Sequence, residues 1–150
     1  MNKKGLYKSS LNNWIGLRNV PEKYTEPQLW IYAKDLSGSN TPLSQEERTS
    51  PKSKVGKWLI FVKKENTNNV WNIIKEATEN GKLGPISKVS ASTQKTHVIC
   101  VYTYSYQDKE DIFRIRYNLG ILGFKSKIPY KTNIATLKGK YGSGTSTYYG

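Results

Sequence analysis

The run from His97 to Tyr104 is the most apolar stretch of the sequence, and it constrains the fold more than any other feature. Most of its residues are β-branched or aromatic, which suits the pleated, packed surface of a sheet. Because both alternating faces of the run are largely apolar, we predict a central strand that is covered on both sides. The single cysteine, Cys100, lies inside this run, so we expect it to be buried and inert, with no internal disulfide.

A helix is predicted directly after this strand. Asp108 is placed to cap it, and the acidic residues Glu110 and Asp111 suit the positive end of the helix dipole. Apolar residues then recur at helical spacing, and Gly123 is the expected stop. These apolar residues are Ile112, Ile115, Leu119 and Leu122.

Strand and helix patterns alternate along the 150 residues, which is a length typical of one domain. Further strands are predicted at 29–32, 58–62, 86–91, 126–131 and 135–141, and a further helix around 70–77. Short joins between strands favour a mainly antiparallel sheet with both helices on one convex face. The predicted class is therefore α+β, with a curved sheet whose other face is partly open.

The remaining segments are polar, and we assign them to the periphery of this domain. We expect an N-terminal arm at 1–27, a domain at 28–142 and a flexible tail at 143–150. Within the domain, residues 34–57 are rich in Ser, Thr, Pro, Gly and charge, which predicts a long mobile loop.

The net charge is +13, and no carboxylate follows Asp111. A field of one sign over the last third of the chain favours an anionic partner such as a nucleotide or RNA. The alternative is a lysine-rich surface that serves only solubility.

The sequence offers no support for a membrane protein or a metalloprotein. No apolar run approaches the roughly 20 residues that cross a bilayer, so we expect a cytoplasmic or nuclear protein. No cluster of metal ligands and no nucleotide-binding glycine motif is present, so we predict neither a metal nor a cofactor.

We expect the open face of the sheet to bind the anionic ligand through basic and aromatic side chains. Basic groups would contact phosphate and rings would stack on a base. The candidate ligand-binding residues are Lys88, His97, Tyr102, Arg116, Tyr130 and Lys131.

His97 is the only histidine, and it opens an alternative. Lys95 and His97 are two apart and so share a face of an extended segment. With Lys131 as a base and His97 as an acid, such a set could remove a proton and expel a leaving group. The competing interpretation is a surface histidine that caps a strand and has no chemical role.

A series of segments resembles a known family over about residues 56–142. The segments are KWLIFV, KLGPISKVS, HVICVYTYSYQDKEDIFRIRYNLGILGF and IPYKTNIATLKGKYG, and they resemble the Bles-type family (basophilic leukemia expressed protein). The resemblance implies the fold of the mRNA-cap-binding initiation factors, a curved antiparallel sheet backed by helices.

The resemblance also bears on function. Cap-binding proteins of that fold stack a methylated base between two tryptophans on loops, but the segment from Lys34 to Lys57 has no tryptophan. The resemblance therefore implies a reduced pocket for a nucleotide or phosphate. Relatives are sometimes grouped with phosphothreonine lyases, to which Lys95-Thr96-His97 and Lys131 are similar in part.

Three functions stay open at this point. The first is a non-catalytic binding module for a phosphate-bearing ligand, a nucleotide or an RNA end, on the concave face. The second is a phosphothreonine-lyase-like enzyme. The third is a protein-interaction domain that uses its helical face or the loop at 34–57.

Overall fold

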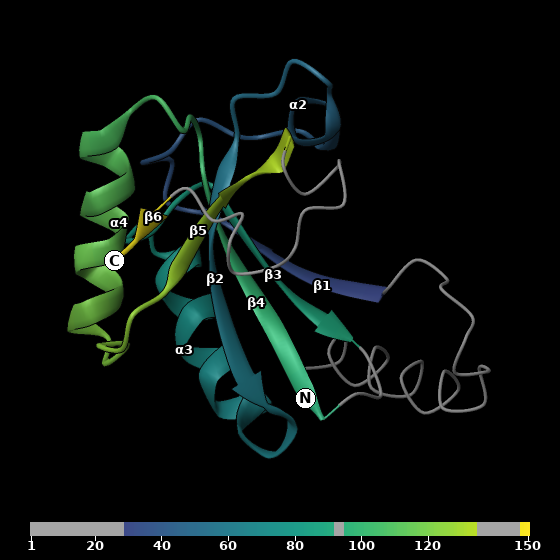
Figure 1. Cartoon of the computed structure of the whole chain (residues 1–150), viewed down its shortest axis with the longest axis vertical. Coiled ribbons are helices and arrows are strands. Elements are labelled where there is room, and N and C mark those ends of the chain that lie inside the picture. The colour runs from purple at the N-terminus through teal and green to yellow at the C-terminus, as the bar shows by residue number, and fades with distance from the viewer. Residues whose placement is uncertain (1–28, 92–94, 135–147) are drawn as a thin grey trace.

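The computed structural model describes residues 29–91, 95–134 and 148–150, and it has the predicted α+β architecture. An antiparallel sheet is covered on one face by two helices, α3 and α4 (Figure 1). The strands are β1 (Leu29–Lys34), β2 (Gly56–Lys63), β3 (Ile86–Ala91), β4 (Thr96–Thr103), β5 (Pro129–Thr132) and β6 (Tyr148–Tyr149). The helices are α2 (Gln45–Thr49), the 3-10 turn η1 (Lys64–Asn66), α3 (Thr67–Glu79) and α4 (Lys109–Ile121).

The apolar run predicted to be central forms β4, in the interior of the sheet. The strand order is β1-β3-β4-β2-β5-β6, and every pairing is antiparallel. β4 pairs with β2 over its whole length, from Thr96 opposite Lys63 to Thr103 opposite Gly56. The other side of β4 pairs with β3. β4 therefore fixes the positions of β2 and β3, which carry much of the site described below.

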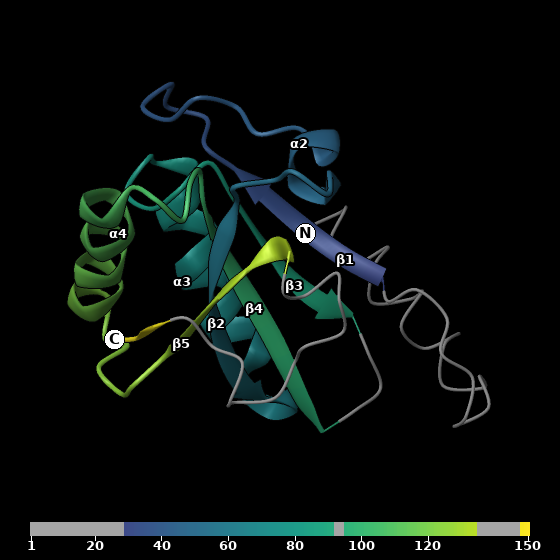
Figure 2. The same cartoon turned by 45° about the horizontal axis from the view of Figure 1, so that its top comes forward.

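Residues on β4 alternate between the two faces of the sheet, as residues on any strand do. Ile99 and Val101 belong to the main core, together with helix residues such as Ile74 and Ile115. Cys100 and Tyr102 belong to a smaller cluster on the opposite face. We call this opposite face the open face, because neither α3 nor α4 lies on it (Figure 2).

α4 begins and ends where capping chemistry predicts. The Asp108 side chain accepts a hydrogen bond from the Asp111 backbone N–H at 3.1 Å, which caps α4. Gly123, just after α4, has φ of +112°, a conformation that glycine adopts without strain. The buried face of α4 consists of Ile112, Ile115 and Leu119, which confirms the helical spacing read from the sequence.

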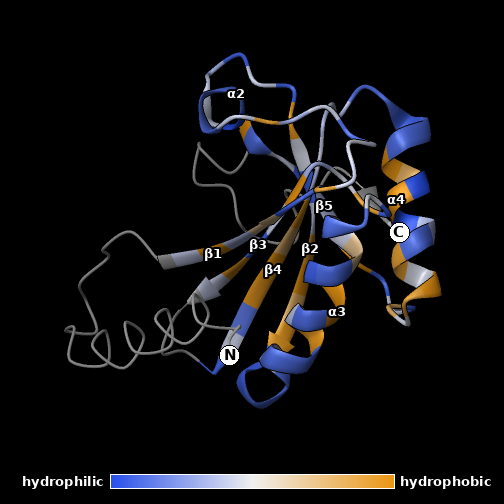
Figure 3. Ribbon diagram, turned by 180° about the vertical axis from the view of Figure 1, so that it is seen from behind, coloured by the Kyte–Doolittle hydropathy of each residue, from blue (hydrophilic) through white to orange (hydrophobic). Residues whose placement is uncertain are grey.

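The core between sheet and helices is apolar and aromatic. Trp58 and Trp71 are fully buried, and the indole N–H of Trp58 donates to the Ile112 carbonyl at 3.1 Å. The outer surface of α3 is polar while its inner surface is apolar (Figure 3). Burial of this apolar face is the main term that holds the helices on the sheet.

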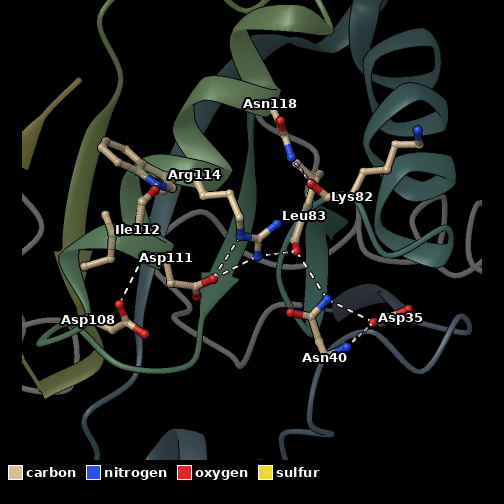
Figure 4. Close-up of polar contacts among 10 residues, drawn as sticks. Asp35, Asn40, Lys82, Leu83, Asp108, Asp111, Ile112, Arg114 and Asn118 are labelled. Carbon is tan, nitrogen blue, oxygen red and sulfur yellow. Dashed lines mark hydrogen bonds and ion pairs between the residues drawn. The ribbon is translucent and has the colours of Figure 1, made fainter.

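Polar contacts attach α4 to the turn that precedes β3 (Figure 4). Arg114 donates to the Leu83 carbonyl at 3.2 Å and Asn118 donates to the Lys82 carbonyl at 2.7 Å. Asn40 donates to the same Leu83 carbonyl and to the Asp35 carboxylate. Residues distant in sequence are thereby joined at one end of the sheet.

Several boundaries differ from prediction. The segment predicted as a long loop contains α2, whose capping box between Ser44 and Glu47 was overlooked. The strand expected at 126–131 is shifted to 129–132. The predicted tail contributes β6, which pairs with β5. The strand expected at 135–141 and the arm at 1–27 lie outside the described residues.

Candidate functional site

Four cationic side chains from four elements gather on the open face, three of them around Tyr102 and the fourth next to Lys57. We call them the cation cluster, and they are Arg48 of α2, Lys57 of β2, Lys88 of β3 and Lys131 of β5. The cross-strand register explains their proximity, because Lys57 lies opposite both Tyr102 and Lys131. The next pairing along the sheet places Lys88 opposite Cys100, whose side chain is on the same face as that of Tyr102.

Tyr102 is the centre of this arrangement. Tyr102 is 1% exposed, and the Nζ atoms of Lys57 and Lys88 each lie 5.7 Å from the centre of its ring. The guanidinium carbon of Arg48 lies 5.5 Å from it. All are within the range of cation–π attraction, so the ring holds positive charges together that would otherwise repel.

Asn133 fixes the position of α2 and Lys57. Its side-chain oxygen accepts a hydrogen bond from Lys57 Nζ at 2.8 Å, and its amide nitrogen donates to the Arg48 carbonyl at 2.6 Å. Its backbone N–H donates to the Val55 carbonyl. Because Asn133 is itself buried, this short polar relay ties the end of β5 to α2 and to the start of β2.

The aromatic side of the site is provided by β1. Lys88 Nζ lies 3.7 Å from the centre of the Trp30 ring, and Arg48 lies 5.2 Å from that of Tyr32. Trp30 is half-buried and Tyr32 is 41% exposed, so rings and charges reach the surface together at this edge of the cluster.

Burial and mutual repulsion act on the lysines of the cluster. The pKa of Lys57 is lowered to about 8, and burial is the main cause. Cys100 opposes this lowering, whereas the nearby charges of Lys88, Lys131 and Arg48 add to it. Burial also lowers the pKa of Lys88, with repulsion from Arg48 as a further cause. Burial lowers the pKa of Lys131 as well.

Within the described part of the chain, no carboxylate pairs with Arg48, Lys57 or Lys88. The salt bridges there join Lys75 to Glu79 and Arg114 to Asp111, both on helices. Arg48 is only 8% exposed, and its buried Nε has no hydrogen-bond partner. Buried charge without an opposite charge is costly, so this face is electrostatically suited to an anion.

Of the residues predicted to bind ligand, Lys88, Tyr102 and Lys131 come together on the open face, whereas His97 does not. His97 is buried on the helix-covered face, where its Nδ1 lies 3.0 Å from the Thr67 hydroxyl at the start of α3. The reason is that His97 and Tyr102 are five residues apart on one strand, and an odd separation places side chains on opposite faces.

The same geometry argues against the lyase-like arrangement. Lys131 is on the face of Lys57 and Tyr102, and the sheet separates it from His97. Lys95 is exposed, beyond the start of β4. An acid and a base on opposite faces of a sheet cannot reach one substrate.

Tyr130 and Arg116 also lie elsewhere than expected. Tyr130 is buried on the helix side, where its hydroxyl lies 2.7 Å from that of Thr103 and its ring packs edge-on against Trp58 at 5.1 Å. Arg116 is on α4, and its terminal nitrogens donate to the carbonyls of Phe124 and Ser126, both at 2.9 Å.

The sequence reasoning missed Arg48, Lys57, Trp30 and Tyr32. The alternation of Trp30, Tyr32 and Lys34 on one strand was a usable signal that the rings share a face. Nothing in the sequence indicated which face of the neighbouring strand they would meet, because register is a property of the assembled sheet.

Two further features of the site concern thiols and metals. Cys100 is a free, buried cysteine, and burial raises the pKa of its thiol, which agrees with the expectation of an inert side chain. Among residues 29–91, 95–134 and 148–150, no group of three or more His, Cys, Asp or Glu could hold a metal ion.

In the same ranges, no helix is long and apolar enough to cross a membrane.

The fold is shared with solved cap-binding proteins at low sequence identity. A C. elegans eIF4E-3, in complex with the 4E-binding protein Mextli and a cap analogue, matches with a TM-score of 0.57 and 14% identity over 92% of this chain and 79% of that chain. A schistosome eIF4E complexed with m7GpppA and 4E-BP matches with a TM-score of 0.55, 14% identity and the same coverage. At 14% sequence identity, this similarity is evidence for the shared fold alone.

A family model also matches the chain, over residues 41–137, or about two thirds of its length. The family is described as basophilic leukemia-expressed protein Bles03. The match spans α2 to β5 and so includes every member of the cation cluster.

Proposed function

This chain belongs to the family of basophilic leukemia-expressed protein Bles03, and we propose that it is a non-catalytic binding module for a phosphate-bearing ligand. The ligand would be a nucleotide or an RNA end, held on the open face of the sheet. The observation that carries this proposal is the gathering of Arg48, Lys57 and Lys88 around Tyr102, with no carboxylate among the described residues to pair with them.

Phosphate suits the cluster better than a carboxylate side chain does. A phosphate offers several acceptor oxygens and up to two negative charges, and it can contact a guanidinium and ammonium groups at once. The unpartnered Nε of Arg48 is one donor that such a ligand could engage. Binding of an anion would also offset the repulsion from neighbouring cations, which adds to the lowering of the Lys57 pKa by burial.

Rings at the edge of the cluster favour a ligand that carries a base. Trp30 is half-buried beneath the ammonium of Lys88, and Tyr32 is partly exposed beside Arg48. Stacking on such rings contributes about 1–3 kcal/mol per base. The complexes of the nematode and schistosome proteins with cap compounds are compatible with a nucleotide as the ligand of this fold.

The test is a titration followed by tryptophan fluorescence at low salt, with inorganic triphosphate, nucleoside triphosphates and a short RNA bearing a 5′-triphosphate. Trp30 lies against Lys88, so a ligand that moves Lys88 should change its emission. We expect binding that weakens as salt rises, because each phosphate contact releases counterions.

Lys88→Gln should weaken binding of each ligand by about 10-fold or more, because it removes a charged contact to phosphate. Lys75→Gln is the matched control, since Lys75 is on α3 and pairs with Glu79 away from the open face. Absence of binding by every ligand at low salt, or equal effects of the two variants, would overturn the proposal.

A further inference from the structure

A cavity of about 310 Å³ lies at the edge of β2, next to the connection between α4 and β5. It exists because β5 pairs with β2 only at Gly56, Lys57 and Trp58, and the chain before β5 then leaves β2 (Figure 2). We call this cavity the edge pocket. Its lining includes Leu59, Phe61, Phe124, Lys125, Lys127 and Pro129.

The connection at 123–128 is held in place at both ends. Arg116 donates to the carbonyls of Phe124 and Ser126, and the Phe124 backbone N–H donates to the Leu119 carbonyl at 3.0 Å. At the other end, Ile128 and Gly150 exchange two backbone hydrogen bonds of 2.9 and 3.0 Å. The position of the pocket wall is therefore set by specific contacts, with Arg116 as a positioning residue.

The pocket combines one exposed ring with two exposed cations. Phe61 is 59% exposed and lies opposite Val98, on the part of β2 that β5 does not pair with. Lys125 and Lys127 are both exposed on the connection at 123–128. A ring beside lysines at a surface pocket is the arrangement by which proteins bind single-stranded nucleic acid, where the ring stacks on a base and the cations contact phosphates.

Phe61 and Lys57 are on the same face of β2, since they are four residues apart. Their separation along the strand is about 13 Å, a distance that a chain of two or more nucleotides covers. Phe61 and the cation cluster thus lie along one line on the open face. The edge pocket begins at Phe61 and reaches around the edge of β2, where Ile60, Phe124 and Ile128 of the helix-side core also line it.

We propose that the edge pocket is a second subsite that binds a base and the neighbouring phosphates of single-stranded RNA whose phosphorylated end occupies the cation cluster. This inference rests on the proposed function and narrows it, because it makes the ligand an oligonucleotide rather than a free nucleotide. The two subsites together predict that affinity grows with the length of the strand.

The first experiment measures dissociation constants for a 5′-phosphorylated oligouridylate series of one to six nucleotides at fixed low salt. We expect affinity to rise by about 10-fold or more between one nucleotide and four, as a base reaches Phe61, and then to level off. An RNA duplex of the same length should lack this gain, because its bases are paired and cannot stack on the ring.

The second experiment repeats the series with variants of the edge pocket. Phe61→Leu should remove the increase of affinity with strand length. The double variant Lys125→Gln/Lys127→Gln should weaken binding of the longer strands, and should reduce the slope of log affinity against log salt concentration by about 0.7 per lost phosphate contact. Tyr117→Leu is the matched control, since Tyr117 is 70% exposed on α4. Circular dichroism checks that each variant folds.

The outcomes separate the two proposals. The edge-pocket proposal is overturned if affinity does not increase with strand length, or if Phe61→Leu keeps the increase. In either case, binding of mononucleotides would still support the cation cluster. Binding that depends on Phe61 but not on Lys88 would preserve the edge pocket and overturn the cation cluster. Absence of binding by any strand overturns both.

Discussion

The arginines of α4 and the cations of the open face show two different uses of positive charge in one small domain. Arg114 bonds to the Asp111 carboxylate and to the Leu83 carbonyl, and Arg116 bonds to two carbonyls. Arg48, Lys57 and Lys88 instead lie against the Tyr102 ring and repel one another, and Lys57 donates to the neutral side-chain oxygen of Asn133. Fixed acceptors on the helix side mark structural roles, whereas the uncompensated charge of the open face favours a binding role.

This comparison predicts that the helix side governs stability and the open face governs binding. Ile115→Ala should produce the largest loss of stability, because Ile115 is fully buried between α4 and the sheet. We expect the free energy of unfolding to fall by about 2–5 kcal/mol in urea denaturation. Ile115→Val, as the milder control, should cost about 1 kcal/mol.

For both Ile115 variants, the affinity of the folded fraction for a nucleoside triphosphate should not change. Ile115→Val keeps most of the packing. A loss of affinity in this variant would show that the two sides of the sheet are coupled, and would contradict the assignment of stability to one side and binding to the other.

The second prediction concerns Lys57 and pH. Its pKa is about 8 in the folded protein and 10.5 in the reference state, so between these values the unfolded chain binds more protons. The free energy of unfolding should therefore rise with pH over this window. The contribution of Lys57 is on the order of 3 kcal/mol, from the difference between these two pKa values.

Lys57→Met should lack this rise, while the exposed Lys54→Met should retain it. The comparison with wild type is needed because burial raises the pKa values of Cys100 and Tyr102, and these groups act in the opposite sense. Nucleotide binding by wild type should weaken as pH passes 8, since Lys57 then loses its charge. Identical pH profiles for wild type and Lys57→Met would contradict the assignment.

The smallest effect is expected at the start of α4. Asp108→Ala removes the side chain that accepts the Asp111 N–H, and should cost about 1 kcal/mol of stability by thermal or urea unfolding. Asp108→Asn keeps an acceptor and should cost less. Neither variant should alter the salt dependence of binding, and a change in that slope would mean that α4 takes part in ligand contact.

Much of the fold could be predicted because its signals are local. The Asp108 cap, the spacing of Ile112, Ile115 and Leu119, and the apolar run of β4 each depend on neighbours within a few residues. The short α2 helix carried a local signal as well, the Ser44–Glu47 capping box, which polar composition concealed.

The sequence by itself determined β4, α4 and the alternation that separates His97 from Tyr102, whose odd spacing already placed them on opposite faces. Only the tertiary structure decided that Arg48, Lys57 and Lys88 meet. Their residues come from three elements, and the registers of β2 with β4 and of β3 with β4 bring them to one ring. Register follows from burying one face of every strand at once, which is a property of the whole sheet and of no single segment.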